Sequence, residues 1–230
     1  MVNHTRNYLL DGEQASYIYY NHKAKLGGTG IVLYLAAEYQ ILTGDKRYSD
    51  WTTRLARHLQ GEILPTGEFR DYYIYLDKLV SIEKNQEYFS FYYPGEAVCG
   101  LARYYTLAPV SEQQPLAEKL HAALKFMLEV RPNTRAEHYT KIPSDSWLMM
   151  GVNEMWKVES LRKPEYANFV FNDADKMITQ MYQVFDAPYP DYVGAFYYEY
   201  GDYPYADGAR CEGLLAAYEL AIKMQETEKA

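Results

Sequence analysis

Four carboxylates stand at the start of segments whose composition predicts buried helices. Glu96 follows a Pro-Gly corner in FYYPGEAVCGLARYY, and Glu212 opens EGLLAAYELAIKM. Asp145 begins DSWLMMGVNEMW, and Asp207 begins DGARCEG. Backbone capping alone accounts for acidic residues at these places, because Asp is a common N-cap and the helix dipole favours a nearby negative charge. If the helix starts border one cleft, the same groups can perform acid/base catalysis, with Asp145 and one of the two glutamates as the pair.

Other polar and aromatic residues near these starts are candidates for substrate binding. Arg210 can hold a carboxylate or phosphate through a bidentate fork, or simply pair with Asp207. The stretch TGEFRDYY alternates polar and apolar residues, which predicts a short strand with one polar face. His138 and Tyr139 suit a general base and a phenolic acid, although a single loop histidine is more often only exposed. The candidate substrate-binding residues are Arg70, Asp71, Tyr93, His138, Tyr139, Trp147 and Arg210.

Tyrosine is unusually frequent, with 26 residues against 8 phenylalanines and 3 tryptophans. The tyrosines gather between the predicted helices, in SYIYY, RDYYIY, EYFSFYY and PYPDYVGAFYYEYGDYPY. A tyrosine ring offers a flat apolar face and a polar hydroxyl group, which suits a partly hydrated cleft. The clusters therefore indicate either loops packed over helix ends or an aromatic rim that stacks on sugars.

The elements that position these residues are helices of two alternating kinds. Apolar helices are expected over 30–43, 96–107, 145–158 and 211–224, and amphipathic helices over 47–60, 111–130 and 164–184. Ser111 is the expected N-cap of the second amphipathic helix. The apolar type can be enclosed on both sides, and the amphipathic type leaves one face in water. A hairpin unit of roughly 50 to 66 residues therefore repeats, with inner and outer layers, as in an α/α toroid whose loops and short strands gather where the inner helices begin. Leu101, Leu148 and Leu214 are expected in its core.

Five segments resemble the six-hairpin glycosidase-like group of α/α toroids: LGGTGIVLYLAAEYQILTGDKRYSDW, TGEFRDYY, YYPGEAVCGLARYY, SDSWLMMGVNEMW and DGARCEGLLAAYELA. The resemblance covers roughly residues 15–224 and includes the LTGDKRY connector between an inner and an outer helix. It implies a carbohydrate-active enzyme, of the glycoside hydrolase, uronate lyase or sugar epimerase type, acting on a glycan in an aromatic-lined cleft. The alternatives are a noncatalytic toroid that binds a glycan or a protein, and a structural segment of a larger enzyme.

The predicted array has about three and a half hairpins, fewer than the six that the resemblance implies. We expect residues 1–230 to form one domain that is incomplete as a toroid. Either it is the C-terminal part of a longer toroid, which we favour, or a second chain completes the ring.

Composition and motifs exclude several classes of function. The net charge of −8 argues against a nucleic-acid partner. No apolar stretch reaches the ~20 residues of a membrane span, and the N-terminus carries no secretory signal as written, which predicts a soluble, cytoplasmic protein. There is no Walker A, dinucleotide or GxSxG motif. Cys99 and Cys211 stand apart from any Cys/His cluster. We therefore expect neither a cofactor nor a metal site.

Overall fold

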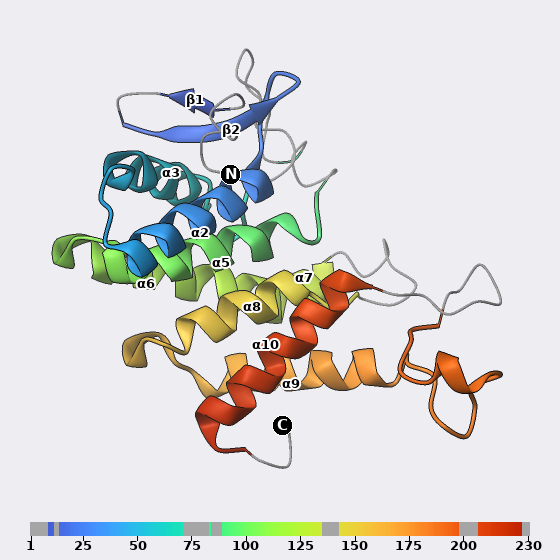
Figure 1. The fold of residues 1–230 in the computed structure, drawn as a ribbon. Helices are drawn as coiled ribbons and strands as arrows, with labels where there is room; N and C mark the ends of the chain where they lie inside the picture. Colours follow the sequence, from blue (N-terminus) through green and yellow to red (C-terminus); the bar gives the residue numbers. More distant parts are fainter. Residues whose placement is uncertain are drawn as a thin grey trace.

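The computed structural model describes residues 9–11, 14–70, 83, 89–134, 143–197 and 207–226. These residues are mostly helical, which confirms the predicted all-α class (Figure 1). A small antiparallel sheet precedes the helices, in the order β1 (Leu9–Asp11), β2 (Ser16–Tyr20) and β3 (Lys23–Ala24). Within the described ranges no helix is both long and apolar enough to cross a membrane.

Four helices pack side by side in chain order, and we call them the inner row. They are α2 (Leu26–Thr43), α5 (Tyr93–Tyr104), α8 (Ser146–Met155) and α10 (Gly208–Met224). Each begins within four residues of the apolar helix predicted there. All four start on the right-hand side of Figure 1 and run to the left. The inner row is therefore parallel, and its helix starts lie at one end of the molecule.

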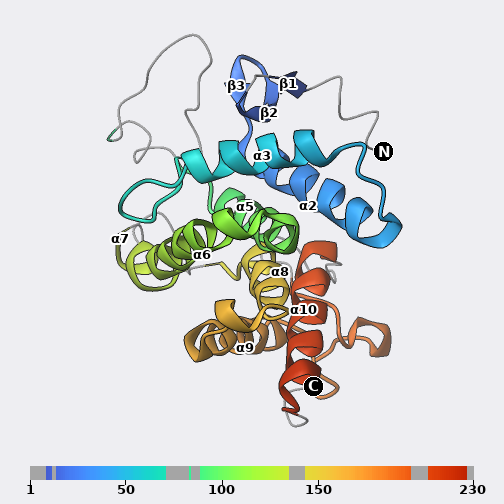
Figure 2. The same ribbon diagram turned by 90° about the vertical axis from the view of Figure 1, so that its left-hand side faces the viewer.

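The amphipathic helices form a second layer. These are α3 (Ser49–Gly61), α6 (Val110–Lys125) and α9 (Pro164–Ile178). In Figure 2, α6 and α9 lie on the left and α2 and α10 on the right, with α5 and α8 between them. α3 buries Trp51, Leu55 and Leu59, the face that the sequence pattern indicated. The inner row thus curves, with the second layer on its outer side.

Shorter elements connect the two layers. After α6 the chain continues through a π-helical turn, η3 (Phe126–Val130), into α7 (Arg131–Thr134). Single 3₁₀ turns follow α5 (η2, Tyr105–Leu107), follow α8 (η5, Glu159–Leu161) and precede the last helix (η6, Pro190–Tyr192). α6, the π-helical turn and α7 follow one another without a break. The amphipathic helix predicted over 111–130 therefore corresponds to a helical segment over 110–134.

Glycines allow the inner helices to approach closely. A β-carbon at Gly30 of α2 would collide with the backbone of α5 at Glu96 and Ala97. A β-carbon at Gly100 of α5 would collide with the backbone of Gly30 in turn. The side chains at these two positions must therefore be absent for α2 and α5 to pack as they do.

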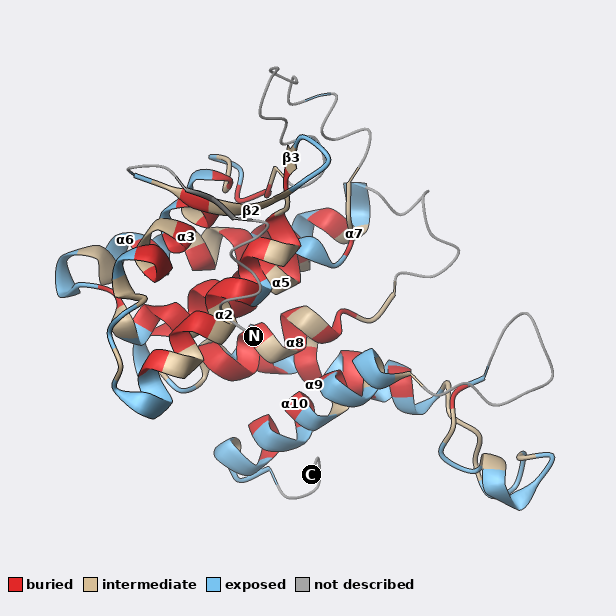
Figure 3. Ribbon diagram, turned by 45° about the horizontal axis from the view of Figure 1, so that its top comes forward, coloured by how far each residue is buried: buried red, intermediate tan, exposed pale blue. Residues whose placement is uncertain are grey.

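The core follows the prediction for the middle of the inner row. Leu101 and Leu148 are fully buried, whereas Leu214 of α10 is only partly buried. Figure 3 shows the difference: buried residues dominate α2 and α5, whereas exposed residues cover much of α10. α10 stands at the end of the row and packs on α8 and α9 only from one side. Its opposite face exposes apolar side chains, namely Leu215, Tyr218 and Ile222.

Three local predictions need correction. Ser111 is not an N-cap, because α6 begins one residue earlier, after Pro109, without a side-chain cap. The helix predicted over 164–184 ends at Ile178, and Met181 pairs with Phe196 in an isolated bridge instead. In TGEFRDYY the pairing is a single bridge between Ile63 and Phe69, so the expected strand is only one residue pair in the described part.

A polar network links the inner helices at the ends opposite their starts. Arg103 of α5 pairs with Glu38 of α2 and, at 3.4 Å, with Glu154 of α8. Lys157 donates to both oxygens of Glu154 at 2.7 and 2.8 Å. Farther along the row, Asn153 of α8 donates to Glu219 and accepts from Lys223, both of α10. The network thus joins the four inner helices through charged and polar side chains.

Candidate functional site

Asp145 is the most constrained carboxylate at the helix starts. It is the N-cap of α8, where Oδ1 accepts from the backbone N–H of Leu148 at 3.1 Å. Its Oδ2 accepts from Nη1 of Arg131 at 3.1 Å, and its backbone N–H donates to Asp173 at 3.0 Å. Its exposed fraction is 0%. Both oxygens are engaged and no surface is exposed, so contact with a substrate requires these bonds to break, and the catalytic role of Asp145 stays a prediction.

Burial and the charge of Arg131 shift the pKa of Asp145 in opposite directions. Burial raises the pKa of its carboxyl group to about 6, although the Arg131 guanidinium and the Leu148 N–H oppose the increase. The carboxylate, paired with Arg131, lies against Gly95 at the start of α5.

Arg131 was not identified from the sequence. It lies at the start of α7, is itself buried, and donates from Nη1 to the backbone carbonyl of Phe91 at 2.9 Å. Its guanidinium also lies 4.2 Å from the centre of the Phe91 ring. Arg131 thus ties the segment before α5 to the start of α8. An N-cap aspartate in an apolar segment implies a cation nearby, but nothing in the sequence indicates which one.

Glu96 is not a helix cap. The N-cap position of α5 belongs to Tyr92, and no side chain caps this helix. The Glu96 carboxylate instead lies against Gly27 of α2, where a β-carbon would collide with Oε2. Glu96 is half-buried, and no described residue makes a hydrogen bond to its carboxylate. Burial raises its pKa to about 7, with the charge of Asp145 as the second cause.

Aromatic residues surround Glu96. Tyr92 and Tyr93 are 43% and 36% exposed, and the ring of Tyr93 lies beside Glu96 over Gly27. Trp147 is half-buried at the first turn of α8, where Gly95 packs against its β-carbon. Burial raises the pKa of Tyr92, and Asp145, Arg210 and Asp207 all act on its phenol. The phenol of Tyr92 is therefore within electrostatic range of charged groups at the starts of α8 and α10.

Asp207 and Arg210 form an ion pair, which is one of the two arrangements predicted for Arg210. Asp207 is the N-cap of α10 and accepts from the backbone N–H of Arg210 at 3.1 Å. Nε of Arg210 lies 3.4 Å from Oδ2 of Asp207, and the guanidinium lies 4.9 Å from the Phe196 ring centre. Both side chains are partly exposed, so the pair is open to a ligand.

The remaining predicted residues are separate from this cluster or outside the described ranges. Glu212 is exposed on α10. Arg70 pairs with Glu62 at 2.7 Å, beyond the end of α3. Asp71, His138 and Tyr139 lie outside the described residues. The described residues include no group of three His, Cys, Asp or Glu side chains that could hold a metal ion.

The structure thus brings Glu96, Tyr92, Tyr93, Trp147, Asp207 and Arg210 to the starts of the inner helices, with Asp145 buried behind them. The chain matches no protein-family model, no curated protein and no solved structure. An assignment of function must therefore come from the chemistry of these side chains.

Proposed function

We propose that the chain is an arc of an α/α toroid and that it acts on a glycan by proton transfer at Glu96. The parallel inner row, the outer layer of amphipathic helices and the common end of the inner helix starts support the toroid. In such an arrangement the inner starts border the cleft. This is the end where the polar and aromatic residues gather.

The position of Glu96 is the observation that carries the proposal. A carboxyl group with a pKa of about 7 can both donate and accept a proton near neutral pH, which is the requirement for a general acid or base. Glu96 is not used as a cap, and no described residue bonds its carboxylate, unlike Asp145 and Asp207. It is thus the acidic residue of the cluster that a substrate can reach without first breaking an internal bond.

The neighbours of Glu96 favour a sugar as the substrate. Exposed tyrosine rings and Trp147 offer apolar faces together with polar groups, which suits sugar rings. Arg210 is held on Phe196 and partly exposed, so it can neutralise an acidic group on the sugar. Hydrolysis needs a second carboxylate, for which the partly exposed Asp207 must exchange its contacts with Arg210 for the substrate, whereas elimination or epimerisation uses a tyrosine as the partner of Glu96.

Turnover of a glycan panel tests the assignment. The panel contains 4-nitrophenyl glycosides and polyuronates such as polygalacturonate, assayed with wild type, Glu96→Gln and Glu212→Gln. We expect turnover of at least one substrate, reduced by about 10²-fold or more in Glu96→Gln, the usual contribution of a general acid. Glu212→Gln is the control on an exposed face and should retain the wild-type rate. Equal rates in wild type and Glu96→Gln contradict the proposal and favour a noncatalytic glycan-binding or protein-binding toroid.

We also propose, in place of the longer toroid that the sequence favoured, that a second copy of the chain completes the ring. Both end helices of the inner row expose apolar side chains, Ile31 and Leu42 on α2 and Leu215 and Ile222 on α10. Head-to-tail pairing of two arcs forms the same interface between α2 of one copy and α10 of the other twice, which covers both edges of each copy and closes the assembly. Light scattering should then give a dimer mass, and Leu215→Glu should give a monomer. A monomeric wild type instead supports an arc completed by further hairpins.

A further inference from the structure

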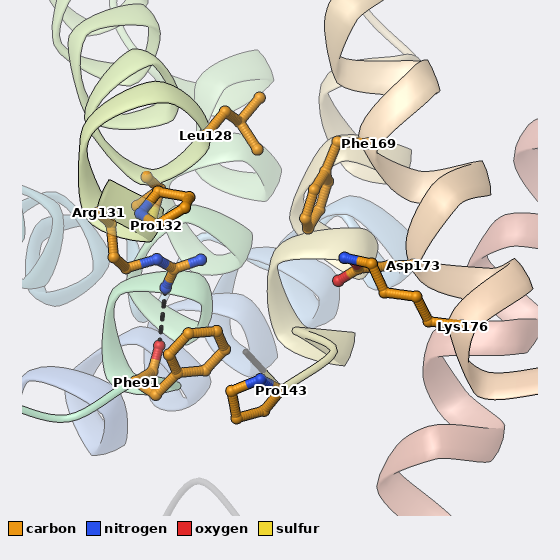
Figure 4. A pocket seen from close by; sticks show the side chains of 9 residues that line it. Phe91, Leu128, Arg131, Pro132, Pro143, Phe169, Asp173 and Lys176 are labelled. Carbon is orange, nitrogen blue, oxygen red and sulfur yellow. Dashed lines mark hydrogen bonds and ion pairs between the residues drawn. The ribbon is translucent and has the colours of Figure 1, made fainter. Parts of the chain in front are cut away.

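A cavity of about 160 Å³ lies between η3, α7 and α9, next to the start of α8 (Figure 4). Asp145 separates it from Glu96. Gly95, adjacent to Glu96, lies against Asp145 on one side, whereas Arg131 and Asp173 bond Asp145 and line the cavity. The cavity is therefore distinct from the cluster at the helix starts.

Arg131 brings unused donors to this cavity. Its side chain is 7% exposed, and its hydrogen bonds to Phe91 and Asp145 both leave from Nη1. Among the described residues, Nε and Nη2 have no acceptor. These two atoms form the side edge of the guanidinium, which matches the two oxygens of a carboxylate. A carboxylate in the cavity can accept a hydrogen bond from each of these two atoms, which stabilises it there.

A second cation and apolar walls define the rest of the cavity. Lys176 lies on the α9 side, 2.7 Å from Asp173, with its side chain 54% exposed. Asp173 already accepts the Asp145 N–H with its other oxygen. Phe91, Phe169 and Leu128 supply the apolar surface, and Figure 4 shows Phe169 and Leu128 facing the gap that the Arg131 guanidinium enters. The site thus offers two cations together with an apolar wall.

The volume sets the size of the ligand. An engineered apolar cavity of about 150 Å³ in another protein binds benzene. A cavity of about 160 Å³ accordingly accepts a six-membered ring, with a carboxylate at the edge where the two cations lie. Inorganic phosphate leaves the apolar wall uncovered, and a neutral ring leaves the Arg131 donors unpaired.

We propose that this cavity binds a small organic carboxylate with a ring-sized apolar body. The carboxylate is held by Nε and Nη2 of Arg131 with support from Lys176, and the ring lies between Phe91, Phe169 and Leu128.

Benzoate is the probe, and its binding is followed by isothermal titration calorimetry and by NMR. We expect a Kd on the order of 0.1 to 1 mM for a ligand of this size. Benzyl alcohol, with the same ring and no charge, and inorganic phosphate, with charge and no ring, should bind at least about tenfold more weakly. Equal binding of all three, or no benzoate binding at about 10 mM, overturns the proposal.

Variants locate the site. Leu128→Trp fills the cavity and keeps both cations, so it should abolish benzoate binding. Arg131→Lys keeps the charge next to Asp145 but removes the side edge of the guanidinium, and should weaken binding at least about tenfold. Lys176→Gln should weaken binding severalfold, whereas Lys46→Gln, an exposed lysine of another segment, should not change it. Circular dichroism confirms that each variant is folded. Unchanged benzoate affinity in folded Leu128→Trp contradicts the assignment to this cavity.

Discussion

The carboxylate of Glu96 on α5 occupies the space into which any side chain at Gly27 of α2 would project. The contact joins two helices that start about seventy residues apart in the chain. It also explains why a carboxylate at a helix start is neither a cap nor an ion pair. Gly27 provides the room in which Glu96 lies half-buried beside the charge of Asp145.

Substitution of Gly27 tests this contact. In Gly27→Ala the new methyl group collides with the end of the Glu96 side chain and with the Tyr93 ring, so both side chains should move while the fold is kept. We expect a loss of any glycan turnover and a change of unfolding free energy within about 1 kcal/mol, because the gain in helix propensity offsets the rearrangement. Chemical denaturation and the turnover assay measure the two effects.

Two neighbouring glycines are matched controls for that variant. A β-carbon at Gly28 meets only ordinary contacts with Lys25 and Ile18, so Gly28→Ala should keep activity and stability. A β-carbon at Gly30 meets the backbone of α5, so Gly30→Ala should destabilise the protein by about 1 to 3 kcal/mol. If Gly27→Ala resembles Gly28→Ala in activity, Glu96 is not confined in the way described.

The stability of the protein should depend on pH through Glu96. The folded protein keeps this proton up to about pH 7, whereas the unfolded chain releases it near the ordinary value of 4.5. The contribution to the unfolding free energy is therefore fully present below pH 4.5 and is lost as the pH rises to about 7. Because Glu96 is partly exposed, we expect about 1 to 2 kcal/mol after allowance for solvent screening.

Glu96→Gln should remove that part of the pH dependence, as measured by urea denaturation between pH 4 and 8. Glu212→Gln, on the exposed face of α10, is the control and should keep the wild-type decrease. The comparison between variants is needed because burial also raises the pKa of Asp145. If the unfolding free energy decreases equally with pH in wild type and Glu96→Gln, the pKa of Glu96 is the same in the folded and the unfolded protein, which contradicts the prediction.

Substitution of one buried and one exposed apolar side chain tests how the core is packed. Leu101 is fully buried in α5, and Leu101→Ala should cost about 2 to 5 kcal/mol of unfolding free energy. Val110 is 84% exposed at the start of α6, and Val110→Ala should change stability by less than about 0.5 kcal/mol. Denaturant unfolding measures both. A cost below about 1 kcal/mol for Leu101→Ala contradicts the placement of α5 in the inner row.

The network at the far ends of the inner helices should behave as a unit. Arg103→Met removes the α5 partner of buried Glu154, which keeps its bonds to Lys157, and should destabilise the protein by about 1 to 3 kcal/mol. The double variant with Glu154→Met should lose less stability than the sum of the two single variants, because the Arg103–Glu154 interaction can be lost only once. A double-mutant cycle measures the coupling, and strictly additive effects contradict a shared network.

The helices could be predicted because their pattern depends on local spacing. Apolar segments such as 30–43 and 96–107 contain the small residues that close packing needs, and Asp145 had the sequence of an N-cap. The partners of the site could not be predicted, because they come from other helices. Arg131 reaches Asp145 only through the path of α7, and Gly27 meets Glu96 only through the crossing of α2 and α5. Exposure of Glu212 follows from the end position of α10, which the repeat pattern does not specify.

The central claim is that Glu96 exchanges its proton near neutral pH because it is half-buried beside Asp145. A carbon-13 NMR titration of the glutamate side-chain carboxyl groups, assigned with Glu96→Gln, measures this directly. We expect a pKa of about 7 in wild type and a lower value in Asp145→Asn, which removes the neighbouring charge. A wild-type pKa near the ordinary value of 4.5 contradicts the assignment of Glu96 as the proton-transferring group.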